Sequence, residues 1–265
     1  MYRRESRARR RRRKSRLPLY AFLLAVLSFV LAFALPPEEK KDLPVQTATV
    51  KPIAAVPDPE PVLPPDPEPV LPPEPGVPDK DAWNLILANP WNPLSEDYAF
   101  TQKALPNGLV VDERCYPDLQ AMMDACRASG LSPVICSAYR SYEKQEELFR
   151  RKVDKLTARG YSAGDAQTEA AREVALPGTS EHQTGLAVDI VDLDNQNLDE
   201  SQEDTAVQKW LMEHSWEYGF ILRYPSGTSD LTGIIYEPWH YRYVGREAAQ
   251  AIHDQGVCLE EYLAA

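Results

Sequence analysis

The stretch PGTSEHQTGLAVDI, residues 177–190, contains a predicted turn, a predicted strand and two side chains that can bind a metal ion. The chain has only four histidines, and one of them, His182, stands shortly before Asp189. Thr184 and Gly185 indicate a bend, which is followed by the strand LAVDI. A carboxylate on a largely apolar strand face is costly unless it is paired or binds a metal. The stretch therefore predicts that His182 and Asp189 lie together, either as a hydrogen-bonded pair or as two ligands of one ion.

A second cluster, YEPWHYR at residues 236–242, adds Glu237 and His240. Taken singly, Glu237 fits a surface salt bridge and His240 fits a packed core histidine. Two imidazoles and one carboxylate, however, make a three-ligand zinc site with one position open for water, and a nearby glutamate can act as general base. The two clusters together predict a catalytic site in which His182, Asp189 and His240 bind Zn2+ and Glu237 is the base.

The two clusters also match a known family. SEHQTGLAVD, residues 180–189, resembles the SxHxxGxAxD motif of the zinc peptidases that include D-alanyl-D-alanine carboxypeptidases, and EPWHYRYVG, residues 237–245, resembles their ExxH motif. SAYRSYEKQEELF and YGFILRYP are similar to segments of the VanY-type branch. The resemblance extends over about residues 81–250. It implies a hedgehog/D-Ala-D-Ala peptidase-like fold, the same three zinc ligands and the same base.

The resemblance implies substrate-binding residues as well. Arg140 follows an apolar strand, and its planar fork of donors suits the terminal carboxylate that a carboxypeptidase must recognise. The alternative for Arg140 is a pair with a local acid. Weaker candidates are Gln145 and Ser180 for hydrogen bonds to the peptide, and Ser137 and Tyr139 as further residues of the cleft.

These features predict a zinc hydrolase that removes the C-terminal D-alanine from peptidoglycan stem peptides. An L,D-carboxypeptidase that trims tetrapeptide stems remains an alternative. The motif with Arg140 disfavours an endopeptidase, which would not need a clamp for a carboxylate. A non-catalytic, zinc-containing wall-binding module is the alternative from another class. Glu237 argues against that module, because a structural zinc site needs no base.

The first 80 residues predict attachment to a membrane. Residues 1–16 are a basic tail with ten Arg and Lys, and residues 17–35 are uncharged and long enough to span a bilayer as a helix. A basic flank stays in the cytoplasm, which places the remainder outside the cell. The alternative is a secreted protein, because Ala32-Phe33-Ala34 resembles a signal-peptidase site. Residues 36–80 are a Pro-rich extended linker in which DPEPVLPP occurs twice in tandem.

Charge excludes one class of partner. The basic tail by itself resembles a nucleic-acid arm, but the net charge is −11 in spite of it, so the remainder is strongly acidic and would repel phosphates. We expect no nucleic-acid partner and a monomer.

Residues 81–265 predict the catalytic domain, of α+β class, with helices packed on one face of a mainly antiparallel sheet. Cys126 is expected in a helix and Cys136 in a buried strand, as small hydrophobic residues or as disulfide partners, and none of the four cysteines forms a CxxC pair. The expected helices are 112–130, 142–160, 162–175, 203–219 and a C-terminal helix, and the expected strands are 83–89, 132–141, 185–191 and 237–245.

Overall fold

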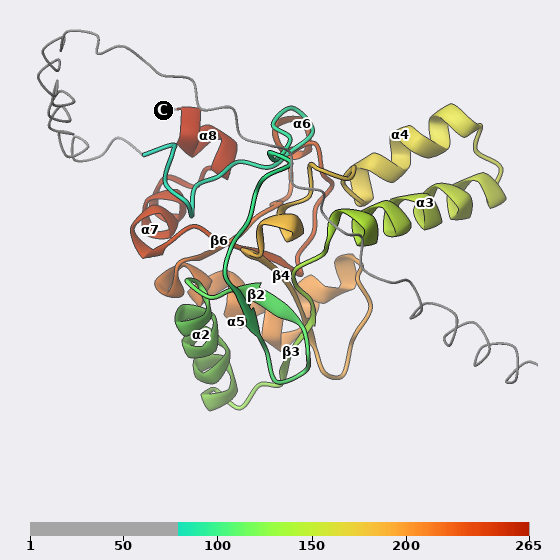
Figure 1. Ribbon diagram of the computed structural model, residues 1–265. Helices are drawn as coiled ribbons and strands as arrows, with labels where there is room; N and C mark the ends of the chain where they lie inside the picture. The colour runs from blue at the N-terminus through green and yellow to red at the C-terminus, as the bar shows by residue number, and fades with distance from the viewer. Residues whose placement is uncertain (1–78, 265) are drawn as a thin grey trace, which may run out of the picture. The chain divides into compact units, whose positions relative to one another are not determined.

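The computed structural model describes residues 79–264 (Figure 1). The predicted basic tail, the predicted membrane helix at 17–35 and almost all of the predicted linker lie outside these residues. Within them, no helix is both long enough and apolar enough to cross a bilayer.

The described chain alternates short strands with helices. The strands are β1 Gln102–Ala104, β2 Val110–Asp112, β3 Pro133–Ser137, β4 Ala187–Asp192, β5 Phe220–Leu222 and β6 His240–Tyr243. The α-helices are α2 Tyr116–Ala128, α3 Tyr142–Ala158, α4 Ala163–Glu173, α5 Ala206–His214, α6 Ser229–Thr232, α7 Arg246–Gln255 and α8 Leu259–Ala264. Three 3₁₀ turns complete the set: η1 Glu181–Thr184, η2 Glu200–Asp204 and η3 Ser215–Tyr218.

The strands form a four-stranded sheet in the order β3-β4-β6-β5 and a separate β1-β2 hairpin. All strand pairs are antiparallel. This arrangement confirms the predicted α+β class with a mainly antiparallel sheet.

The two faces of the sheet differ in chemistry. Side chains alternate along a strand, so Val188 and Ile190 of β4 share a face with Tyr241 and Tyr243 of β6. This face belongs to the main apolar core, to which α2 and α5 contribute Leu119, Met122, Cys126, Val207 and Leu211. The opposite face carries the polar residues of the candidate site.

Helices pack on both faces, so the expectation of one covered face is wrong. Ile221 of β5 is paired with Arg242 and therefore lies on the polar face. It belongs to a second apolar cluster with residues of α7 and α8, among them Ala249, Ile252 and Leu259. This cluster closes the β5 end of the polar face.

Helices α3 and α4 run side by side as a hairpin (Figure 1). Each begins at a serine whose hydroxyl accepts a backbone N–H of the first turn, Ser141 from Lys144 and Ser162 from Asp165. Such caps stabilise a helix by about 1 kcal/mol. Leu156 of α3 packs with the alanines of α4, so the hairpin has a small apolar core of its own.

Two predicted strands differ from the structure. Instead of the expected strand at 83–89, residues 83–85 form a turn and residues 86–88 are irregular. The carbonyl groups of Asn84 and Ile86 accept hydrogen bonds from Arg242 and not from a neighbouring strand. Strand β3 is present, but it lies at the edge of the sheet, where Cys136 is exposed and not buried as expected. The four cysteines are unpaired, and Cys126 is buried in α2 as expected.

Gly185 makes the bend between η1 and β4. Its φ of +73° lies in the left-handed region, which glycine adopts at no steric cost. A Cβ at this position would lie 2.5 Å from the ring of Phe100 and 3.0 Å from the backbone nitrogen of Asp112. Two constraints, the backbone conformation and the close approach, therefore require glycine here.

Gly185→Ala should destabilise the fold through both constraints. Gly130, with φ +81° and nothing within 4 Å of an added Cβ, is the matched control for the backbone term, about 1–2 kcal/mol. Overlap with Phe100 should add roughly 1–3 kcal/mol at Gly185. Equilibrium unfolding in urea measures both variants, and equal losses at the two positions would contradict the close approach.

Candidate metal centre

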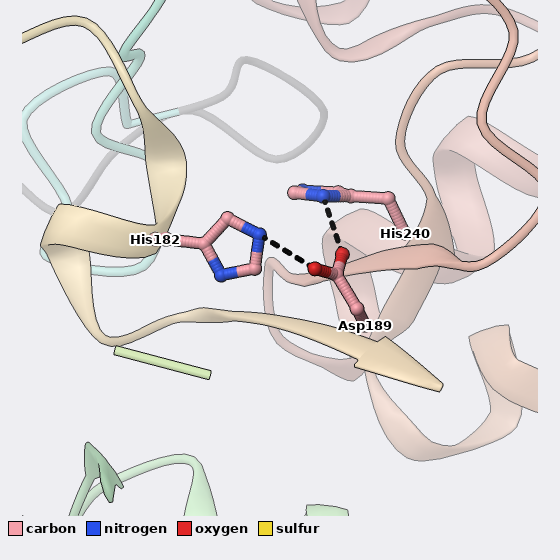
Figure 2. Close-up of side chains that lie close together, drawn as sticks. All are labelled: His182, Asp189 and His240. Carbon is pink, nitrogen blue, oxygen red and sulfur yellow. Dashed lines mark ion pairs between the residues drawn. The ribbon is translucent and has the colours of Figure 1, made fainter. Parts of the chain in front are cut away.

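The turn η1 fixes the first histidine. His182 is buried, and its Nδ1 lies 2.7 Å from the carbonyl oxygen of Ala138. Since a carbonyl only accepts, Nδ1 carries the proton and Nε2 is left with a lone pair. That nitrogen lies 3.3 Å from Oδ2 of Asp189 (Figure 2). The predicted proximity of His182 and Asp189 is therefore present.

The register of the sheet brings in the second histidine. Asp189 of β4 is the cross-strand partner of His240 of β6. His240 Nδ1 lies 3.1 Å from Asp189 Oδ1, as Figure 2 shows. The three side chains converge although they come from a turn and two different strands.

These three residues fit a metal ion. One ligand atom from each of His182, Asp189 and His240 can be chosen so that all lie within 4.8 Å of one another, and all three residues are buried. Two ligands of a tetrahedral zinc ion with bonds of about 2.0–2.1 Å lie about 3.3 Å apart, close to the two N–O distances given above. Asp189 Oδ1 is buried and accepts no hydrogen bond from the described residues. A cation bound between these atoms would satisfy that oxygen.

The pKa shifts show how strongly this site favours a cation. Burial, together with the charge of Arg140, lowers the pKa of His182 to about 4, so this imidazole is neutral, as a metal ligand must be. For His240, burial opposes the charged form, but the neighbouring carboxylates of Asp189 and Glu181 outweigh it and raise the pKa to about 9. These carboxylates hold a proton on His240, and a metal cation would take the place of that proton.

Glu237 lies beside the three candidate ligands. Its Oε2 is 3.6 Å from His240 Nδ1, and its backbone N–H donates to the carbonyl of Tyr224. Burial raises the pKa of Glu237 to about 8, and nearby Asp189 acts in the same direction. A carboxyl group in this setting takes up a proton more readily than a solvated one, which suits a general base.

A cleft of about 790 Å³ opens over the site. One wall is α3 with the end of α4, and the opposite wall is formed by residues 198–201 and 234–240. The candidate ligands, Glu237, Arg140, Gln145 and Ser180 all line it.

Arg140 is paired with a local acid, and that acid is the candidate ligand itself. Its Nη2 donates to Asp189 Oδ2 at 2.6 Å and to Ser137 Oγ at 2.8 Å. The guanidinium of Arg140 therefore contacts a candidate metal ligand and also lines the cleft. The carboxylate-binding role stays a prediction, since the observed contacts are with the protein.

The other predicted substrate residues separate into two groups. Gln145 donates to the carbonyl of Ala175, and its Oε1 is buried without a partner among the described residues. Ser180 is buried at the cleft. Ser137 instead holds Arg140, and Tyr139 packs edge-to-face on Phe100. Neither Ser137 nor Tyr139 lines the cleft.

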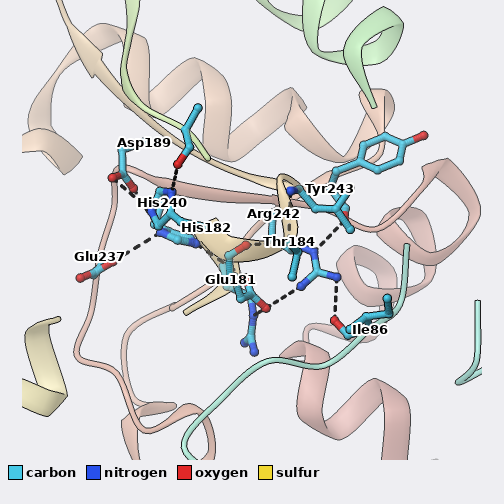
Figure 3. Close-up of polar contacts among 12 residues, drawn as sticks. Ile86, Glu181, His182, Thr184, Asp189, Glu237, His240, Arg242 and Tyr243 are labelled. Carbon is cyan, nitrogen blue, oxygen red and sulfur yellow. Dashed lines mark hydrogen bonds and ion pairs between the residues drawn. The ribbon is translucent and has the colours of Figure 1, made fainter. Parts of the chain in front are cut away.

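Sequence reasoning missed a charged network next to the site (Figure 3). Glu181 is fully buried between Arg223 and Arg242. These arginines stand 42 and 61 residues away in the chain, so no local spacing connects them. The only indication in the sequence is a charged residue inside the buried motif SEHQTGLAVD.

Comparisons with known proteins place the chain in a family. The VanY family model, D-alanyl-D-alanine carboxypeptidase, matches residues 108–246. A D-alanyl-D-alanine carboxypeptidase of Enterococcus faecalis is 48% identical over 186 residues, which are 70% of this chain and 67% of that relative.

Solved structures are similar as well. VanYB in complex with D-alanine-D-alanine is 47% identical, with a TM-score of 0.65 over 69% of this chain and 99% of that one. A Glu-to-Ala mutant of the D,D-pentapeptidase VanY, from a VanB-type vancomycin resistance cassette and in complex with Zn(II), gives a TM-score of 0.64 at the same identity and coverage. The LD-carboxypeptidase LdcB is 35% identical, with a TM-score of 0.55 over 69% of this chain and 86% of that one.

Proposed function

Since the chain belongs to the VanY family of D-alanyl-D-alanine carboxypeptidases, we propose that it removes the terminal D-alanine from peptidoglycan stem peptides ending in D-Ala-D-Ala. As a member of this family it is a zinc-dependent carboxypeptidase, which sets aside the non-catalytic module that the sequence left open. The observation that supports the proposal most directly is the convergence of two buried histidines, Asp189 and Glu237 at the floor of one cleft.

His182, Asp189 and His240 would hold the zinc ion. When bound, zinc supplies a water of lowered pKa and polarises the scissile carbonyl. Glu237 accepts the proton of the attacking water and then delivers it to the leaving amine of D-alanine. Its buried position, which raises its affinity for a proton, suits both halves of this transfer.

Arg140 is proposed to hold the terminal carboxylate of the substrate. It lines the cleft and already lies against a carboxylate, that of Asp189. With zinc bound, Asp189 would share its charge with the ion, and donors of the Arg140 guanidinium would become available to the substrate. Gln145 and Ser180 also line the cleft, and we propose that they form hydrogen bonds to the peptide.

Stem peptides test this proposal. A pentapeptide ending in D-Ala-D-Ala should lose one D-alanine, measured as product mass, and a chelator should abolish the loss. The same pentapeptide with a C-terminal amide should react at least about 30-fold more slowly, because Arg140 then lacks its charged partner. Hydrolysis of the tetrapeptide but not of the pentapeptide would establish the L,D-carboxypeptidase alternative, and equal cleavage of acid and amide would exclude a carboxylate clamp.

Replacing the base separates chemistry from metal binding. Glu237→Gln keeps the shape of the side chain but cannot accept the proton, so kcat for D-alanine release should fall by about 10²–10⁴-fold. Zinc content should stay at the wild-type level, because Glu237 is not needed as a ligand. Glu213, on the exposed surface of α5, provides the matched control Glu213→Gln, which should leave kcat unchanged. Release of D-alanine by Glu237→Gln at the control rate would contradict this assignment.

For location, we propose a single-pass protein with its catalytic domain outside the cell. The basic residues 1–16 followed by the apolar residues 17–35 support this orientation. Fractionation of cells should find the full-length chain in the membrane, and protease added to cells without a wall should degrade the catalytic domain. Recovery of the protein in the medium, beginning near Pro36, would establish cleavage instead.

A further inference from the structure

Glu181 lies inside the metal-binding motif, yet the reaction does not use it. Its carboxylate is fully buried and faces the imidazole of His240 (Figure 3). We propose that Glu181 is a positioning residue. It accepts the Nε2 proton of His240 and thereby presents Nδ1 to the metal, and Glu260 of α8 supports it through Arg223.

The geometry singles out one oxygen and one nitrogen. Glu181 Oε2 lies 3.7 Å from His240 Nε2. Each atom is buried, and neither has a hydrogen-bond partner in the described part of the chain. A shift of about 1 Å would bring them to hydrogen-bond distance. Such a shift is within reach of an imidazole that turns to coordinate an ion at its other nitrogen.

The tautomer of His240 decides whether it can be a ligand. A neutral imidazole carries one proton, on Nδ1 or on Nε2. Nδ1 is the nitrogen on the metal side, 3.1 Å from Asp189 Oδ1, so the proton must reside on Nε2. Glu181 is the acceptor that fixes it there, as the carbonyl of Ala138 fixes the opposite tautomer of His182.

Two arginines hold Glu181 in this orientation. Its Oε1 accepts hydrogen bonds from Arg223 Nε and Arg242 Nη1, each at 2.7 Å. A carboxylate buried without such partners would be strongly destabilising. Because both guanidiniums bind the same oxygen, Oε2 is left for His240.

The arginines are in turn fixed by distant parts of the chain. Arg242 donates to the carbonyl groups of Asn84 and Ile86. Arg223 binds both oxygens of Glu260, at 2.8 and 2.6 Å. Glu260 lies in α8, beyond the residues 108–246 that the family model matches.

The charges of this network balance, since two arginines face two glutamates. Arg223 bonds both Glu181 and Glu260. Without Glu260, Arg223 would interact with Glu181 alone and would draw the Glu181 carboxylate away from His240. The C-terminal helix therefore contributes to the metal site without touching it.

Zinc affinity, measured by competition with a chromophoric chelator, tests the proposal without any substrate. The proposed role of Glu181 rests on the zinc site and not on the identity of the peptide, so its failure is distinct from the failure of the proposed function. Glu181→Gln should weaken zinc binding by about 10–100-fold, and Glu260→Gln should weaken it in the same direction by a smaller factor.

Asp118→Asn is the matched control. Asp118 is also a carboxylate in contact with an arginine, Arg246, at 2.6 Å, and it bonds the hydroxyl of Tyr243. It lies away from the candidate ligands, so its loss should lower stability and leave zinc affinity unchanged. If Glu181→Gln weakens zinc binding no more than Asp118→Asn does, the network is structural and the proposal fails.

A spectroscopic signature completes the test. With only four histidines, the imidazole protons and nitrogens of the zinc-loaded, full-length protein are accessible to NMR. His240 should carry a slowly exchanging proton on Nε2, and this proton should exchange faster in Glu260→Gln. A proton on Nδ1 of His240, or an Nε2 proton that Glu260→Gln leaves unaffected, overturns the proposal even where Glu181→Gln does not fold.

Discussion

The antiparallel pairing of β4 with β6 is the constraint on which the site depends. It places Asp189 directly opposite His240, at the short distance that cross-strand partners share. The bend at Gly185 then returns the chain so that His182 meets the same carboxylate. A slip of one residue in this register would place Asp189 and His240 on opposite faces of the sheet. The candidate metal site therefore forms only when β4 and β6 pair in this register.

Placing the site on a covered face of the sheet has an electrostatic consequence. Charged groups on that face are removed from water, so each requires a partner. Arg140 compensates Asp189, and two arginines compensate Glu181. The pKa of His240 is raised, and Arg140 holds the pKa of Asp189 well below its usual range against the effect of burial. Both shifts point to the same demand for positive charge at the centre. A divalent cation meets this demand better than a proton does.

Local interactions explain which parts of the fold were predictable. The observed bounds of helices α3 and α4 lie close to the expected ones, because the serine caps of both helices and Gly160 after α3 are local signals in the sequence. The strand expected at 83–89 is absent, and two carbonyl groups that a strand would use instead accept hydrogen bonds from an arginine 158 and 156 residues further along the chain. Apolar composition alone could not reveal that competition. The sequence predicts a buried Cys136, but the residue is exposed at the sheet edge, because an edge strand and a central strand have similar local sequences.

The sequence by itself determined which residues are the candidate ligands and the candidate base, because their spacing within two short motifs is a local property of the chain. Only the tertiary structure decided that Arg140 lies against Asp189, that Ser137 and Tyr139 stand away from the cleft, and that Glu181 faces His240. Those contacts join residues from separate elements. Their partners are selected by burial and charge compensation, which act through space and leave no periodic pattern in the sequence.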